Sequence, residues 1–219
     1  MKTTTLTITG YANRLVPHEF IRQDGETGHL AILLPGFAYS GNMPIFYYAG
    51  TLFLTAGADL LRLEYAYNLD PDFRTLAPEN RLARLLADAL PAVYAARAQR
   101  TYTSVSVVAK SLGTVTLAHL LARRELPNTT TATWLTPILS DDMVLETIRS
   151  YRGPQLVVIG ESDPEYSADL IGTLASEPGP RTLTIPEADH SLDIPGDTMA
   201  SIEALSATIS AISSLISMR

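Results

Sequence analysis

The chain has 219 residues, 46% of them hydrophobic and 18% charged, which is typical of one compact domain with a large buried core. Its formal net charge of −7 would be repelled by nucleic acid and by anionic membranes, so the composition argues against either as a partner. The chain contains no cysteine, which excludes disulfides, thiolate metal ligands and a cysteine nucleophile.

Short segments between residues 3 and 185 have the patterns of strands. Residues 3–9 alternate polar and β-branched side chains with a period of two, and with residues 19–22 they would add an antiparallel edge. Apolar runs rich in Val, Ile and Leu then predict buried strands at 30–34, 60–65, 105–109, 131–135, 156–159 and 182–185.

Segments with helical spacing separate several of these runs. Over residues 82–90 apolar side chains recur every three or four positions, which predicts a helix with one buried face. Pro91 is expected to kink or end the first part of this helix, with residues 92–100 continuing it. Further helices are expected at 44–54, 114–124 and 198–218.

The alternation of strands and helices predicts a parallel sheet, because parallel neighbours need crossover connections that usually hold a helix. The predicted class is α/β: a mostly parallel, twisted sheet with helices on both faces, a three-layer sandwich over a single domain, residues 1–219. No linker marks a second domain or a large cap. Residues 136–150 are the longest segment that could form a small lid.

A serine, Ser111, lies where the strand at 105–109 ends and the helix at 114–124 begins, in the segment Ala-Lys-Ser-Leu-Gly. A nucleophile at such a turn takes a strained backbone conformation, and the residues two before and two after it must be small. Ala109 and Gly113 meet that requirement. The segment resembles the nucleophile elbow of the α/β-hydrolase superfamily, usually Gly-x-Ser-x-Gly, with Ala109 in place of the first glycine.

The resemblance extends to the residues that follow later strands, because the superfamily places serine, acid and histidine in that order. The strand at 156–159 is followed by Gly-Glu-Ser-Asp-Pro, in which Asp163 matches the acid and Glu161 is the nearby alternative. The strand at 182–185 is followed by Pro-Glu-Ala-Asp-His-Ser-Leu, in which His190 matches the base. The chain is therefore similar to small, uncapped serine hydrolases of the dienelactone-hydrolase and esterase type.

This resemblance implies a role for each residue. Ser111 would attack a carbonyl, His190 would accept the serine proton, and Asp163 would hold the imidazole in the correct tautomer. The negative oxygen formed in the attack needs two backbone N–H donors. These are expected from Leu112, the residue after the nucleophile, and from Phe37, in a segment that resembles the superfamily's His-Gly loop.

Aromatic residues near this loop and after the strand at 60–65 are candidates for a substrate pocket. Tyr39, Tyr47 and Tyr67 are the predicted substrate-binding residues, although half of the aromatic set around Tyr47 would be helix core if 44–54 is a helix. The chain has no nucleotide-binding glycine motif and no His or carboxylate cluster at ligand spacing. Neither a cofactor nor a metal is therefore expected.

Several polar residues near the predicted site have simpler explanations. Lys110, beside the nucleophile, is expected to be an exposed elbow residue without a chemical role. Asp141 and Asp142 are an alternative source of the acid, but with Ser140 as N-cap they are better explained as the start of a helix. The other histidines are expected to be structural: His18, His29 and His119.

The predicted function is a serine hydrolase that cleaves a small ester or related acyl substrate through an acyl-enzyme on Ser111. A peptidase or thioesterase would use the same three residues, and a non-catalytic scaffold that binds a partner or a small ligand is the alternative outside the enzymes. No signal peptide or membrane span stands out in the sequence, so a cytoplasmic location is expected. The sequence assigns no oligomeric state.

Overall fold

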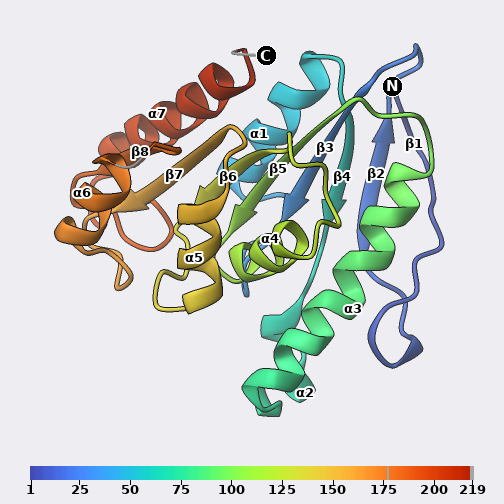
Figure 1. Cartoon of the computed structure of the whole chain (residues 1–219), viewed down its shortest axis with the longest axis horizontal. Coiled ribbons are helices and arrows are strands. Elements are labelled where there is room, and N and C mark those ends of the chain that lie inside the picture. The colour runs from blue at the N-terminus through green and yellow to red at the C-terminus, as the bar shows by residue number, and fades with distance from the viewer. Residues whose placement is uncertain (177, 218–219) are drawn as a thin grey trace.

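The computed structural model describes residues 1–176 and 178–217, which form one eight-stranded sheet with helices around it (Figure 1). The strands lie in the order β1-β2-β4-β3-β5-β6-β7-β8. Their bounds are β1 Lys2–Thr3, β2 His18–Arg22, β3 His29–Leu34, β4 Asp59–Leu63, β5 Ser104–Lys110, β6 Thr131–Leu135, β7 Gln155–Gly160 and β8 Pro180–Ile185.

The sheet is antiparallel at one edge and parallel over the rest. β2 pairs antiparallel with β1 and β4, whereas every pair from β4–β3 to β7–β8 is parallel. The six predicted buried strands and the antiparallel strand at 19–22 are confirmed, with ends shifted by at most two residues. Because β3, β5, β7 and β8 are parallel, the loops that follow them meet at one edge of the sheet.

The strand predicted at 3–9 is wrong beyond its first residue. Of these residues only Thr3 belongs to a strand, and Thr9 pairs with Leu15 in an isolated bridge. The physical reason is a tight turn at Tyr11–Asn13, where two residues have positive φ. This turn folds the segment back on itself and so prevents it from continuing along β2.

Helices cover both faces of the sheet and complete three layers (Figure 1). α1 and α7 lie side by side on one face, α3, α4 and α5 pack in sequence on the other, and α6 contacts β8. Their bounds are α1 Pro44–Thr55, α2 Pro71–Thr75, α3 Pro78–Arg97, α4 Leu112–Ala122, α5 Asp142–Ser150, α6 Ala168–Ser176 and α7 Thr198–Ile216, with 3₁₀ turns η1 Tyr11–Asn13 and η2 Tyr67–Leu69. The predicted α/β class, a mostly parallel sheet with helices on both faces, is confirmed.

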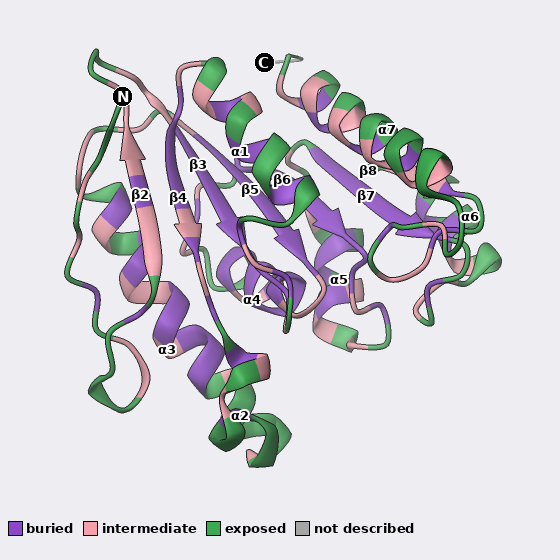
Figure 2. Cartoon of the chain, turned by 180° about the vertical axis from the view of Figure 1, so that it is seen from behind, coloured by how far each residue is buried: buried purple, intermediate pink, exposed green. Residues whose placement is uncertain are grey.

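Two apolar cores lie on opposite faces of the sheet, whose central strands are buried (Figure 2). The larger core includes Trp134 and packs the sheet against α3, α4 and α5. The smaller core includes Phe46 and packs the sheet against α1 and α7. Successive side chains of a strand point to opposite faces, so Val108 belongs to the smaller core and Ala109 to the larger one.

Several predictions for the helical segments and the lid candidate differ in detail from the structure. α3 runs through Pro91 as one helix and ends at Arg97 instead of continuing to residue 100. The lid candidate at 136–150 holds α5, which packs against α4. The last predicted helix ends at Ile216 among the described residues, and Met218, its predicted end, lies outside them.

α7 is long and apolar enough, with a mean hydropathy of 1.5, to cross a membrane by length and composition alone. In the structure the helix buries one stripe of residues, spaced by three and four positions, against the sheet: Ala204, Thr208, Ile212 and Leu215. That packing accounts for the apolar stripe of α7 as part of the outer layer of the fold.

Candidate active site

Ser111 lies at the sharp turn between β5 and α4 and is the N-cap residue of α4. Its backbone has φ 49° and ψ −117°, a conformation that residues with a side chain rarely adopt, so the turn is strained. Two backbone hydrogen bonds hold it in place. The Ser111 N–H donates to Leu135 O at an N···O distance of 3.0 Å, and the Thr114 N–H donates to Ser111 O at 2.8 Å.

Close packing around this turn explains its small residues. A Cβ on Gly113 would lie 2.2 Å from the carbonyl oxygen of Leu34, the last residue of β3. A Cβ on Gly36 would lie 3.2 Å from the Cβ of Ser111, so the loop after β3 lies directly against the elbow. Ala109 is fully buried, and its methyl group belongs to the larger core. The elbow therefore accepts alanine at position 109.

His190 and Asp163 form a series of hydrogen bonds with Ser111. The distance between His190 Nε2 and Ser111 Oγ is 2.8 Å, and the distance between His190 Nδ1 and Asp163 Oδ2 is 2.9 Å. A carboxylate only accepts hydrogen bonds, so Nδ1 carries the proton and Nε2 is free to accept one from the serine hydroxyl. The structure thus brings together the three residues predicted for acyl transfer, in an arrangement that can activate the serine.

Asp163 is buried and held by its own loop. Its Oδ1 accepts a hydrogen bond from the Glu165 N–H at 2.9 Å, so both carboxylate oxygens are engaged. Backbone contacts join this loop to the histidine loop. The Ser162 N–H donates to Ala188 O at 2.9 Å, and a Cβ on Gly160 would lie 2.1 Å from the same oxygen. Glycine at 160 is therefore what lets the acid and the histidine approach each other.

The alternative acids lie elsewhere. Glu161 is exposed to solvent. Asp141 accepts hydrogen bonds from the N–H groups of Met143 and Val144 at the start of α5. The expected helix cap is present, but the capping residue is Asp141 and not Ser140, because α5 begins at Asp142. The Ser140 hydroxyl donates to Glu165 Oε1 instead.

The two N–H groups predicted to bind the substrate oxygen both belong to segments at the elbow. Leu112 is the first residue of α4, where backbone N–H groups have no partner within the helix. Phe37 follows Gly36, and its carbonyl oxygen accepts a hydrogen bond from the Asn68 N–H at 3.2 Å. Within residues 1–176 and 178–217 neither N–H donates a hydrogen bond, so both are available to a ligand.

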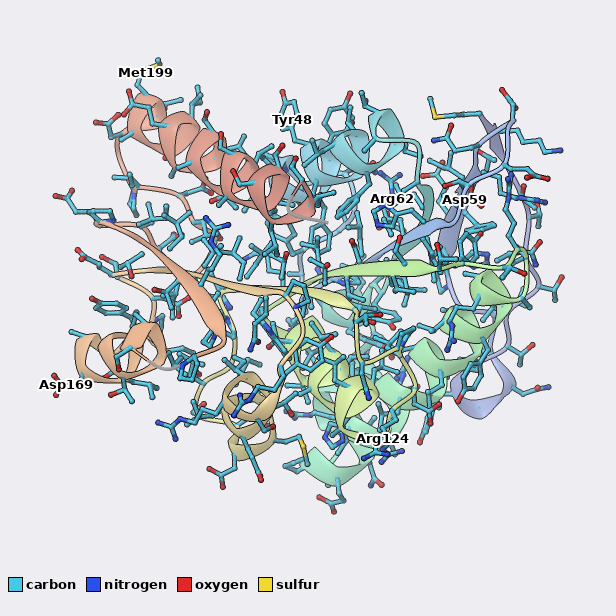
Figure 3. The ribbon with its side chains drawn as sticks, turned by 45° about the horizontal axis from the view of Figure 1, so that its top comes forward. Tyr48, Asp59, Arg62, Arg124, Asp169 and Met199 are labelled. Atoms are coloured by element: carbon cyan, nitrogen blue, oxygen red, sulfur yellow. The ribbon has the colours of Figure 1, made fainter. Side chains whose placement is uncertain are left out.

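Two of the three predicted substrate residues, Tyr39 and Tyr47, lie just before α1 and on it. The Cβ of Tyr39 would be 3.5 Å from a Cβ on Gly36, which places Tyr39 beside the elbow. Its hydroxyl accepts a hydrogen bond from the Ile45 N–H at 3.1 Å. Tyr47 is exposed and packs edge-on against Tyr48, which Figure 3 shows at the surface of α1. Of this pair, the structure brings only Tyr39 to Ser111.

Tyr67, predicted to form the opposite wall, is buried in the core. Its hydroxyl donates to Asp88 Oδ2 at 2.7 Å, and its ring stacks on Phe73 with centroids 4.1 Å apart. Burial raises the pKa of Tyr67 well above its usual value. The side chain therefore serves the fold, and this segment contacts the site through the backbone of Asn68 instead.

An apolar hollow of about 210 Å³ lies beside Tyr39 and the histidine loop, although neither Ser111 nor His190 lines it. It lies between the start of α1, the histidine loop and the first turns of α7, and Ser191, the residue after His190, borders it. Its apolar lining includes Tyr39, Met43, Ile45, Leu192, Ile202 and Leu205. Sequence reasoning missed this hollow apart from Tyr39.

The remaining histidines make local contacts. His18 Nδ1 lies 2.7 Å from Val16 O, and His29 Nε2 lies 2.9 Å from Ser106 Oγ. His119 lies on α4, where burial lowers its pKa. Among the described residues, no three His, Asp or Glu side chains gather as potential metal ligands.

Lys110 contradicts the expectation of an exposed elbow residue. It is 2% exposed, and its Nζ donates to the backbone oxygen of His190 and to Thr136 Oγ1. The alternation of side chains along β5 explains this placement, because it puts Lys110 on the same face of the sheet as the buried Val108.

Comparisons with known proteins find similar solved structures. No protein-family model and no curated protein matches the chain. A dienelactone hydrolase from Anabaena variabilis has 17% identity and a TM-score of 0.71, with 99% of this chain and 97% of that chain covered. A putative α/β hydrolase of unknown function from Agrobacterium tumefaciens has 19% identity and a TM-score of 0.74, with 98% and 97% covered. A serine hydrolase without a lid from Xanthomonas campestris has 15% identity and a TM-score of 0.68, with 99% and 94% covered.

Proposed function

We propose that this chain, which has the α/β-hydrolase fold, is a serine hydrolase that cleaves a small ester through an acyl-enzyme on Ser111. The observation that carries the proposal is the series of hydrogen bonds from Ser111 Oγ to His190 Nε2, 2.8 Å, and from Nδ1 to Asp163, 2.9 Å. A serine hydroxyl beside an imidazole that a buried carboxylate orients is the arrangement that activates serine for attack on a carbonyl.

In the acylation half of the reaction, Ser111 Oγ bonds to the substrate carbonyl carbon while its proton passes to His190 Nε2. The carbonyl oxygen becomes negative and is bound by the N–H groups of Leu112 and Phe37; losing one such donor typically costs ~3 kcal/mol. The bond to the leaving oxygen then breaks, and the departing alcohol takes the proton from His190.

In the deacylation half, water attacks the acyl carbon while His190 accepts its proton. The bond to Ser111 Oγ breaks, the serine regains a proton from His190, and the carboxylic acid leaves. Asp163 keeps the imidazole in one orientation through both halves and stabilises its positive form without taking the proton.

The hollow beside Tyr39 supports a small substrate. Its volume of about 210 Å³ is below the roughly 300–1,000 Å³ of sites for drug-sized ligands, which suits a short apolar acyl or alcohol group. A dienelactone hydrolase and a serine hydrolase without a lid are among the structures similar to this chain, and both names fit a small ester at an open site.

A panel of p-nitrophenyl esters with increasing acyl length, together with a thioester and an anilide, tests the proposed function. We expect short esters to be hydrolysed fastest and the anilide slowest. Faster cleavage of the thioester or the anilide would still fit an acyl-enzyme on Ser111, but it would make the protein a thioesterase or a peptidase. A folded protein that hydrolyses none of these compounds would refute the catalytic proposal and favour a binding scaffold.

Ile202→Trp is expected to raise KM for a short p-nitrophenyl ester by about 10-fold while kcat stays close to native, because the ring fills the hollow without contacting Ser111. Met199→Trp is the matched control. Met199 lies on the same helix but does not line the hollow, and it projects into solvent (Figure 3). Equal KM values for the two variants would show that the hollow does not hold the substrate.

A further inference from the structure

Lys110 connects three loops at the edge of the sheet where Ser111 lies. Its Nζ donates to the backbone oxygen of His190 at 2.6 Å and to Thr136 Oγ1 at 2.8 Å, and it lies 5.0 Å from the centroid of the Tyr39 ring. Through these two hydrogen bonds the ammonium links the loop after β6 to the loop after β8. The Tyr39 ring, from the loop after β3, lies against it. Lys110 makes these contacts from the position directly before the proposed nucleophile.

Charged groups from two loops face this ammonium. The carboxylates all favour the charged lysine: Asp163, Asp189 and Asp193. Burial disfavours the charge more strongly, so the pKa of Lys110 falls from 10.5 to about 8. The ring of Tyr39 also lies against the ammonium, and burial raises the pKa of the Tyr39 hydroxyl to about 12.

The buried ammonium makes the folded protein less stable at neutral pH. Between pH about 8 and 10.5 the unfolded chain binds the Lys110 proton more tightly than the folded one. The penalty is therefore present below about pH 8 and disappears as the pH rises towards 10.5. Methionine would fill similar space without that penalty, so the fold alone gives no reason for lysine here.

We propose that Lys110 is a positioning residue whose ammonium fixes the backbone at His190 against Thr136 and so aims the imidazole at Ser111. The inference rests on the proposed function, because it assumes that Ser111 and His190 react. The His190 side chain is 41% exposed, so a fixed backbone adds to the hydrogen bond with Asp163 in limiting the swing of its ring.

Lys110→Met removes both hydrogen bonds and the charge while keeping the length of the side chain. We expect kcat to fall about 10- to 100-fold with KM unchanged, because displacing a catalytic group by about 1 Å has an effect of that size. A merely structural effect would instead reduce the amount of folded protein, which thermal unfolding measures, and leave kcat per folded molecule unchanged.

Two further measurements keep the test decisive. Lys2→Met removes the other lysine of the chain, which is exposed in β1, and should change neither kcat nor KM. In the native protein, kcat/KM should fall above about pH 8 as Lys110 loses its proton. This second readout decides the question even if Lys110→Met does not fold.

The outcomes separate the two proposals. A native protein that hydrolyses no ester overturns both the proposed function and the role of Lys110. A native protein that is active, with a Lys110→Met variant of native kcat, overturns the positioning role alone. A native kcat/KM that stays constant from neutral pH to about pH 10, where lysine normally titrates, also overturns the positioning role alone.

Discussion

Ser111→Ala is expected to lower kcat/KM for short esters by at least about 10³-fold, because without Oγ no acyl-enzyme forms and water must attack the substrate directly. The donors at Leu112 and Phe37 stay in place, so a small residual rate should persist. The variant should remain folded, since alanine only removes a hydroxyl from a turn whose backbone is held by hydrogen bonds to Leu135 and Thr114. Initial rates and thermal unfolding measure the two effects.

Ser162→Ala is the matched control for this substitution. Ser162 is an exposed serine beside Asp163, and its backbone N–H, which alanine keeps, binds the histidine loop. We expect near-native activity from it. If Ser111→Ala were as active as Ser162→Ala, Ser111 could not be the nucleophile.

Gly113→Ala is expected to destabilise the protein by about 3 kcal/mol and to lower kcat by about 10²-fold. A Cβ at this position would lie 2.2 Å from Leu34 O and 2.8 Å from Leu34 C, which are backbone atoms that cannot rotate away. The clash is relieved only by moving α4 away from β3. That movement displaces Leu112 and the loop with Phe37 relative to Ser111.

Gly172→Ala provides the contrast. Gly172 lies in α6, and a Cβ there would have no heavy atom within 4 Å. Alanine is the better helix former, so this variant should be as stable as the native protein or more stable by up to about 1 kcal/mol. Urea unfolding of both variants measures the difference. Equal stabilities would mean that the elbow does not need the close approach of α4 to β3.

The three residues of the serine–histidine–carboxylate series could be placed from the sequence because each follows a strand with a clear apolar run. Parallel strands bring the loops after them to one edge, so Ser111, Asp163 and His190 are predicted to meet although 79 residues separate the first from the last. The same reasoning located Gly36 and Phe37 after β3. The fold class followed from the alternation of strands and helices.

Contacts across the sheet edge were not predictable from local patterns. Lysine is usually exposed, and only its place at the end of a strand that is buried after its first residue signalled that Lys110 would lie inside. Tyr67 follows a strand as a pocket residue would, but its partner Asp88 lies on α3. The hollow combines Tyr39 with Ile202 from the other end of the chain, and no periodicity relates those two segments.

The most direct test of the activated serine is intact mass after treatment with a fluorophosphonate, in parallel on the native protein, Ser111→Ala and His190→Ala. We expect one adduct on the native protein and none on either variant under the same conditions, because reaction requires both the hydroxyl and the imidazole 2.8 Å from it. A folded native protein that stays unlabelled, or equal labelling of Ser111→Ala, would contradict the assignment of Ser111 as the nucleophile.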